Sequence, residues 1–328
     1  MTAPMPPPRR VLAVMDAGAD PGALHAAAAL ADRHGATLEV LACIEPPHDI
    51  GVLARLAGRG AEDILGDLAA RRRADVQAAI AAHLPGRPVA LQVRHGKTFV
   101  EVVRHVIAQG VDFVVKTAEP LTGLDRFLFA STDQHLLRKC PCPVWLQTAG
   151  AAAAPRRVLA AVDVDAWDAD EPETLDALNA RVIDTACRIA APDAAEVIVL
   201  HAWDAMGEGL VWAFSSTGDA RAAADAYIND VIGARRRALD RVIEDAAARH
   251  GPGMPRLRAR LVRGAPERVI DEESRAQAVD VVVMGTVART GMSGVFIGNT
   301  AENIINSLSC PVLAVKPGGF VSPLDGPG

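Results

Sequence analysis

The chain has 328 residues, half of them hydrophobic and 23% charged, a composition that excludes a globally disordered protein and suggests about two domains. Its 34 basic and 40 acidic residues give a formal net charge of −6 at pH 7, which argues against a dedicated nucleic-acid-binding protein. Aromatic residues make up only 4% of the chain, so platforms for base stacking are scarce as well.

The first half of the chain alternates between apolar strand patterns and helical patterns. The expected strands are 11–15, 37–44, 90–94, 113–115 and 144–147. The expected helices are about 21–34, 61–83, 99–109 and 132–139. Near-continuous apolar strands that alternate with helices are typical of right-handed βαβ units and of a parallel sheet covered on both faces.

The second half repeats this rhythm after a linker of small residues at 149–155. The expected strands are 158–162, 196–203, 257–262, 281–284 and 312–316. The expected helices are about 173–190, 221–250, 266–277 and 300–307. We therefore place the two domains at 1–150 and 151–328.

Four sequence matches in the same order show that the chain contains one domain twice. RRVLAVMD at 9–16 resembles RRVLAAVD at 156–163, and the glycine of 94–96 recurs in 262–264. DFVVKT at 112–117 resembles DVVVMG at 280–285, and CPV occurs at both 142–144 and 310–312. The predicted fold class is α/β, with two tandem Rossmann-like five-stranded parallel-sheet sandwiches that bind ligands at the carboxyl ends of their strands.

The loop after the fourth strand of the second domain is rich in glycine, at positions 285, 291, 294 and 298. Its backbone amides and the start of the next helix near Thr300 predict an anion-binding concavity, and Arg289 is a candidate phosphate clamp. The alternative is a plain strand-to-helix connection in which Asn299 caps the helix and Glu302 completes a capping box. The two interpretations are compatible.

Other polar residues and the cysteines have both functional and purely structural interpretations. Asp16 and Asp163 each follow the first strand of a domain. A carboxylate at this place can bind a ribose hydroxyl or a hydrated Mg²⁺, or it can stabilise a turn or cap a helix. The charge runs 71–73 and 235–237 are expected to be solvated helix faces. His201, at the end of a strand, is expected to pack rather than to catalyse or bind metal. The five cysteines, including Cys140 and Cys142, are expected to be reduced, buried thiols.

The tandem repeat, the first-strand aspartate and the segment GTVARTGMSGVFIGNTAENI at 285–304 resemble the universal stress protein family. The segment 131–145 resembles the tandem E-type members of that family. The family loop has Gly, two residues, Gly, nine residues, then Gly and a hydroxyl residue. Gly285, Ala288, Gly298 and Asn299 occupy those places, with Thr300 next to them.

The resemblance implies an ATP site with Mg²⁺ in the second domain. It assigns Asp163 to the metal and the nucleotide, and Val199 to the border of the adenine. The loop residues that it implies are Gly285, Gly298, Asn299 and Thr300. Ala288 takes a family position in the same loop, and Arg289 stays the candidate phosphate clamp. Ala288 places a Cβ where the family has glycine, so the phosphate grip differs from the family pattern.

The loop of the first domain departs further from the family. It lacks three of the glycines, Glu119 repels phosphate, and Pro120 has no amide donor. We predict that the first domain does not bind ATP and is structural or holds an apolar ligand.

The implied function is a regulatory binding protein of the stress response without efficient catalysis, because no nucleophile–base pair or carboxylate dyad stands out. No apolar targeting segment or stretch of about 18 apolar residues occurs, so a cytoplasmic protein without a membrane span is expected. The resemblance also implies an internal pseudo-dimer with 143–147 paired to 311–316. A homodimer of the chain and a regulatory protein partner stay open.

Three alternatives remain. The first is a slow ATPase that uses the same loop. The second is a binder of an apolar or lipid-like ligand, with Met206, Trp212 and Phe214 in a lid. The third is an interaction scaffold that binds no nucleotide.

Overall fold

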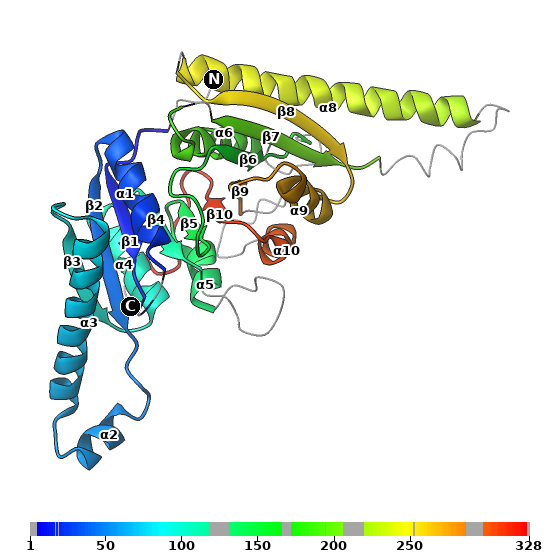
Figure 1. The fold of residues 1–328 in the computed structure, drawn as a ribbon. Coiled ribbons are helices and arrows are strands. Elements are labelled where there is room, and N and C mark those ends of the chain that lie inside the picture. The colour runs from blue at the N-terminus through cyan, green and yellow to red at the C-terminus, as the bar shows by residue number, and fades with distance from the viewer. Residues whose placement is uncertain are drawn as a thin grey trace.

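A computed structural model describes residues 5–326, apart from 17, 19, 119–130, 166–171, 194, 206–219, 252 and 287–297. The chain forms one ten-stranded sheet with the strand order β3-β2-β1-β4-β5-β10-β9-β6-β7-β8 (Figure 1). Each half of the chain supplies five adjacent strands. The predicted fold class is confirmed, and the two five-stranded halves share a single continuous sheet.

The element bounds follow the predicted ones closely. The first half contains β1 (Arg10–Val14), α1 (Gly22–His34), β2 (Thr37–Ile44), α2 (Ile50–Leu56), α3 (Ala61–His83), β3 (Ala90–His95), α4 (Thr98–Gln109), β4 (Phe113–Thr117), α5 (Ser131–Lys139) and β5 (Val144–Gln147). The second half contains β6 (Arg157–Ala161), α6 (Pro172–Ile189), β7 (Glu196–Trp203), α8 (Ala220–His250), β8 (Arg256–Arg263), α9 (Pro266–Ala276), β9 (Val281–Gly285), α10 (Asn299–Ser307) and β10 (Val312–Val315).

One antiparallel strand pair joins two parallel half-sheets. In the first half β1 lies between β2 and β4, and in the second half β6 lies between β7 and β9, all in parallel register. At the junction β5 pairs with β10 in antiparallel register, with Trp145 opposite Leu313. The pairing of the two final strands, expected from the resemblance, is therefore confirmed.

Alternate strand residues face two separate hydrophobic layers. One layer contains Val11 and Ala13 of β1 and is covered by α1, α3, α6 and α8. The other contains Leu12 and Val14 and is covered by α4, α5, α9 and α10. These helices span both halves of the sheet, so each face carries one continuous apolar layer. This burial on both faces explains why the strands read as unbroken apolar runs.

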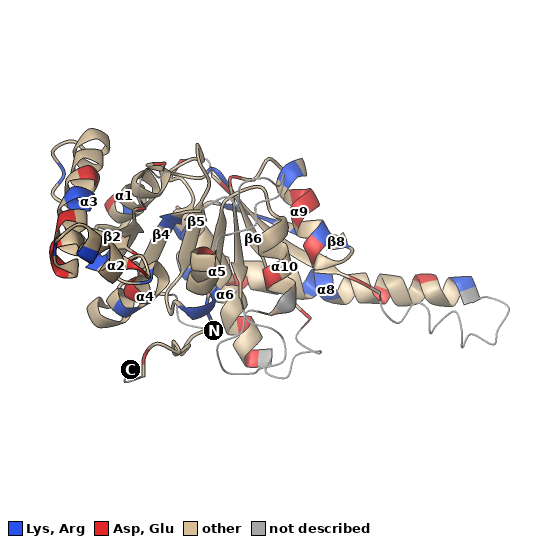
Figure 2. Ribbon diagram, turned by 90° about the horizontal axis from the view of Figure 1, so that it is seen from below, with Lys and Arg blue, Asp and Glu red and all other residues tan. Residues whose placement is uncertain are grey.

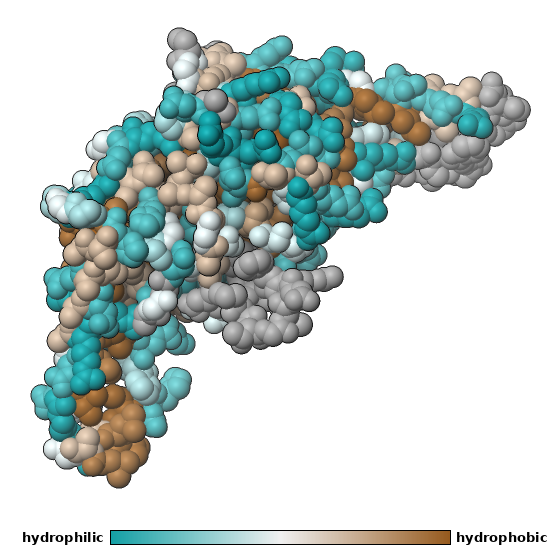
Figure 3. Space-filling model, in the orientation of Figure 1, coloured by the Kyte–Doolittle hydropathy of each residue, from teal (hydrophilic) through white to brown (hydrophobic). Residues whose placement is uncertain are grey.

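Two helical features depart from a compact outline. The seven-residue helix α2 was not predicted, and its Leu56 is 81% exposed; Figure 3 shows an apolar tip over this helix. Helix α8 has 31 residues, and Figure 1 shows its N-terminal turns extending past the strands. Acidic and basic residues both occur along α3, α8 and α9 (Figure 2). Among the described residues no helix is both long and apolar enough to cross a membrane.

Candidate functional site

A pocket of about 1360 Å³ opens where β6, β7 and β9 end, between α6 and α8. Carboxyl ends of parallel strands are the usual ligand side of such sheets, because the strand order reverses there and leaves a crevice. Asp163 follows β6, Trp203 ends β7, and Gly285 ends β9, so each strand contributes to the floor. The start of α10 closes one side through Gly298 and Thr300.

The structure brings four of the predicted site residues to this pocket: Asp163, Gly285, Gly298 and Thr300. Val199 is fully buried inside β7, one residue before the pocket-lining Leu200. The backbone of Asn299 begins α10, but its side chain lies outside the described residues. The predicted loop residues Ala288 and Arg289 also lie outside them, as does the proposed lid with Met206, Trp212 and Phe214.

The predicted capping box at α10 is wrong. Gly298 is the N-cap of this helix and makes no side-chain cap, whereas Asn299 is the first helical residue. The Gly298 amide donates to the Thr286 carbonyl oxygen at 3.1 Å. Glu302 instead forms an ion pair with Arg138 of α5. Gly298 has no side chain with which to cap the first amides of the helix, and free amides at a helix N-terminus suit an anion.

Gly285 leaves room for a side chain of α6. A Cβ built at this position would lie 2.7 Å from Cδ2 of Leu178, which projects from α6. The glycine therefore lets α6 approach the end of β9.

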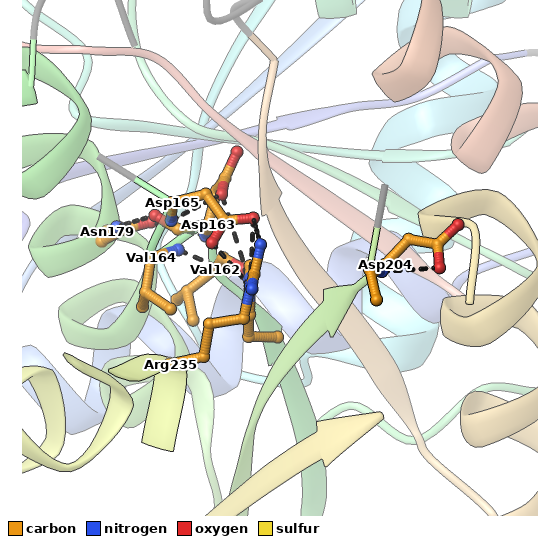
Figure 4. A network of polar contacts seen from close by, with 9 residues as sticks. Val162, Asp163, Val164, Asp165, Asn179, Asp204 and Arg235 are labelled. Carbon is orange, nitrogen blue, oxygen red and sulfur yellow. Dashed lines mark hydrogen bonds and ion pairs between the residues drawn. The ribbon is translucent and has the colours of Figure 1, made fainter. Parts of the chain in front are cut away.

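Asp163 is held at the pocket floor by a helix side chain (Figure 4). Its amide donates to Oδ1 of Asn179 at 3.0 Å, and Nδ2 of Asn179 donates to the Asp163 carbonyl oxygen at 2.6 Å. The Asp165 amide donates to Oδ1 of Asp163 at 3.1 Å. Asn179 thus fixes the chain after β6 so that the Asp163 carboxylate, 27% exposed, faces the pocket.

Asp165 forms a buried ion pair with Arg235 of α8. Nε of Arg235 lies 2.8 Å from Oδ1, and Nη2 lies 3.2 Å from Oδ2. Burial alone raises the pKa of Asp165, but the neighbouring His201 ring and Arg235 guanidinium outweigh it and lower the pKa to about 2. The Arg235 guanidinium also lies 5.4 Å from the centre of the Trp203 ring.

The expectation that 235–237 forms a solvated face is wrong for its first residue. Arg235 is only 7% exposed, whereas Arg236 and Arg237 are exposed. Arg235 lies one helical turn from the fully buried Leu239 and so shares the face of α8 that packs on the sheet. Consecutive residues of a helix point in different directions, and composition does not tell which of three consecutive arginines faces the sheet.

His201 is fully buried at the end of β7. Its Nδ1 lies 3.2 Å from the Val162 carbonyl oxygen, and its Nε2 lies 3.7 Å from Oδ2 of Asp165. The ring was expected to pack in the core or at the surface, and its position beside two aspartates was not predicted. The available signal was the Asp-Val-Asp spacing at 163–165 after one strand and a histidine at the end of its neighbour.

The corresponding crevice of the first half contains an internal cation. Nζ of the fully buried Lys116 lies 2.7 Å from Oδ2 of Asp16 and 3.1 Å from Oδ1 of Asp133. In the strand registers Lys116 of β4 corresponds to Met284 of β9, and Asp16 corresponds to Asp163. The residues Glu119 and Pro120, on which the prediction for this half depended, lie outside the described part of the chain.

The comparisons with known proteins agree with this architecture. The profile of the universal stress protein family matches residues 8–147 and 156–316. Universal stress protein E of Escherichia coli K12 is 30% identical over 73% of this chain and 72% of its own length. A universal stress protein E homolog of Haemophilus influenzae is 31% identical over 63% of this chain and 62% of its own.

Solved structures share the fold. A protein of unknown function from Pseudomonas aeruginosa PAO1 superposes with a TM-score of 0.61 at 23% identity, covering 94% of this chain and 93% of its own. A universal stress protein from Archaeoglobus fulgidus superposes with a TM-score of 0.55 at 18% identity, covering 94% and 99%.

Proposed function

The chain belongs to the universal stress protein family, and from this premise we propose that its second half binds ATP with Mg²⁺ as a regulatory ligand. The protein then acts in the stress response, in the cytoplasm, as a nucleotide-binding regulator without efficient turnover. The first half serves as its structural counterpart.

The observation that carries the proposal is the pocket of about 1360 Å³ with Asp163, Gly298 and Thr300 on its walls. These are three of the positions to which the family resemblance assigns the nucleotide. The start of α10 offers backbone amides to a phosphate, and Gly298 leaves room beside them. In the first half, the Lys116 ion cluster takes up the equivalent position.

The charges of the pocket require a cation with the nucleotide. Its walls carry five carboxylates, at Asp163, Asp165, Asp204, Asp230 and Glu267, against two arginines, Arg235 and Arg241, and the side chain of Arg235 is engaged by Asp165. A triphosphate beside Asp163 therefore needs a divalent ion between the two anionic groups. Oxygen ligands are those that Mg²⁺ prefers, and Asp163 is the exposed carboxylate best placed to supply one.

Calorimetric titration with ATP and Mg²⁺ tests this proposal. We expect about one equivalent bound by the wild type and none by Gly298→Arg, whose side chain fills the space at the start of α10. Gly66→Arg is the matched control, because Gly66 is exposed in α3 with nothing near its Cβ position. No binding at millimolar ATP contradicts the proposal, and steady release of phosphate favours the slow ATPase instead.

The size and lining of the pocket favour a second candidate, an apolar or lipid-like ligand. Ligand pockets usually enclose about 300–1,000 Å³, and this pocket of about 1360 Å³ is larger. The walls from α6 and α8 carry mainly apolar side chains: Leu175, Leu178, Val182, Val231, Ala234 and Ala238. A ligand with an apolar part would remove this surface from water.

Mass spectrometry of the purified protein under native conditions tests the second candidate. We expect a copurified apolar ligand in the wild type that is lost in Ala234→Trp, whose side chain projects into the pocket. Ala247→Trp, on the exposed side of α8 outside the pocket, serves as the control and retains the ligand. This candidate is contradicted if native mass spectra show no bound ligand and solvent extraction of the purified protein releases none.

A further inference from the structure

We propose that Asp163, Asp165 and His201 form a binding site for a divalent transition cation of the Zn²⁺ class, and that this site fills without nucleotide. One ligand atom from each residue lies within 4.8 Å of the others. The three residues come from the ends of the adjacent strands β6 and β7, so the sheet fixes their spacing. The proposal does not depend on ATP binding.

His201 is oriented as a metal ligand. Nδ1 lies 3.2 Å from the Val162 carbonyl oxygen and 3.4 Å from the Val164 amide nitrogen. In the tautomer that carries the proton on Nδ1, this nitrogen donates to Val162, and the lone pair of Nε2 faces Asp165. A backbone carbonyl that holds one ring nitrogen and leaves the other free is the usual support for a ligating histidine. Nε2 is buried, and it has no hydrogen-bond partner among the described residues.

The site already attracts a cation from the chain itself. Arg235 approaches both oxygens of Asp165, at 2.8 and 3.2 Å, and neutralises one of the two carboxylates. A divalent ion supplies more charge in a smaller volume, so it competes with the guanidinium for Asp165. The Asp163 carboxylate is 27% exposed toward the pocket and provides the route of entry.

The first half shows that the fold does not require this cluster. By strand register, Gly18 and Ala42 stand where the second half has Asp165 and His201. In the first half the positive charge is the ammonium group of Lys116, which lies beside Asp16. The second half has Met284 at that position and gains two further metal-ligand side chains.

The donor set selects the class of ion. Two carboxylates with one imidazole suit borderline divalent metals such as Zn²⁺. Tetrahedral Zn²⁺ with bonds near 2.0–2.2 Å sets its ligands about 3.4 Å apart. The distance of 3.7 Å between Nε2 of His201 and Oδ2 of Asp165 is close to that separation. The three ligand atoms lie within 4.8 Å of one another, so the carboxylates would have to move inward to bind the ion.

The test is a Zn²⁺ titration of the chelator-treated full chain without nucleotide, followed by calorimetry. We expect one equivalent bound by the wild type and a loss of affinity of at least about tenfold in His201→Ala and in Asp163→Asn. Asp16→Asn, the matching change in the first half, should bind as the wild type does. Arg235→Met should bind Zn²⁺ more tightly by about tenfold, because the competing charge is gone, whereas Arg236→Met should not.

Cobalt substitution distinguishes this site from the thiols. With Co²⁺ we expect visible d–d bands without a thiolate charge-transfer band, and the same bands in the double variant Cys140→Ala/Cys142→Ala. Binding that survives in both His201→Ala and Asp163→Asn overturns the proposal. So does binding that is lost in the cysteine variant, or the absence of Zn²⁺ binding in wild-type protein that is folded by circular dichroism.

Discussion

The ammonium of Lys116 lies 2.7 Å from the carboxylate of Asp16, although the lysine is fully buried. In the other half of the chain the same two positions hold Met284 and Asp163. At this strand end the first half carries its own cation, whereas the second half has an uncharged side chain beside its pocket.

Lys116→Met should destabilise the first half strongly. The change leaves Asp133, which is fully buried, without the ammonium 3.1 Å away. Removing one partner of a buried ion pair costs about 3–5 kcal/mol, because the remaining charge stays buried. Urea unfolding followed by circular dichroism measures the loss. Lys97→Met, a change at an exposed lysine, is the control, and equal stability of the two variants contradicts the interpretation.

Met284→Lys should place a lysine ammonium beside Asp163, as Lys116 lies beside Asp16 in the first half. The new ammonium reaches Asp163 as Lys116 reaches Asp16, and it supplies the positive charge for which Mg²⁺ or Zn²⁺ is proposed. We expect both cations to bind at least about tenfold more weakly, since a fixed charge now competes with them. Calorimetry measures the effect. Unchanged affinity in a folded variant shows that Asp163 is not the cation ligand.

Asp165 should contribute to stability at neutral pH and lose this contribution in acid. Its pKa in the folded protein, about 2, lies below the ordinary value of 3.8, so the folded state favours the ionised carboxyl. The contribution is complete above pH 4 and fades as the pH falls toward 2; it amounts to about 2 kcal/mol. The difference in unfolding free energy between the wild type and Asp165→Asn should shrink by that amount across the interval. Parallel stability curves contradict the expectation.

Arg33→Ala should weaken the contact between the two halves. From α1, Arg33 donates to the carbonyl oxygens of Arg188, at 2.7 Å, and Ala190, at the end of α6. Loss of hydrogen bonds from a charged donor costs about 1.5–3 kcal/mol. Thermal unfolding should show a lower midpoint than in Arg55→Ala, an exposed arginine of α2. Equal midpoints mean that these contacts add nothing to stability.

The thiols should react slowly in the native protein. Burial raises the pKa of Cys43 and Cys187 to about 12 and that of the half-buried Cys310 to about 11. Because the thiolate is the reactive form, alkylation at pH 8 should modify Cys310 first, and all five should react quickly after unfolding. Peptide mass spectrometry gives the order. Earlier modification of Cys140 or Cys142 shows that this buried pair opens.

The sequence predicted the strands and most helices within about two residues, because apolar runs and helical spacing are local signals. It missed α2, a short helix whose Leu56 is exposed and gives no buried stripe. It misplaced Arg235, since the inner side of a long helix depends on where the sheet lies. It also missed the approach of His201 to Asp165, which join only when β6 and β7 pair. The local sequence of a strand does not tell which other strand it pairs with or in which register.

The antiparallel junction of β5 and β10 turns the two halves in opposite directions. The carboxyl ends of the strands, and with them the Lys116 cluster and the large pocket, therefore face opposite ends of the molecule. A partner seated over one end leaves the other end accessible, so both can be engaged at once. Amide hydrogens that bond β5 to β10 exchange with solvent only when the shared sheet opens at the junction, so we expect their exchange to report on the coupling between the two halves.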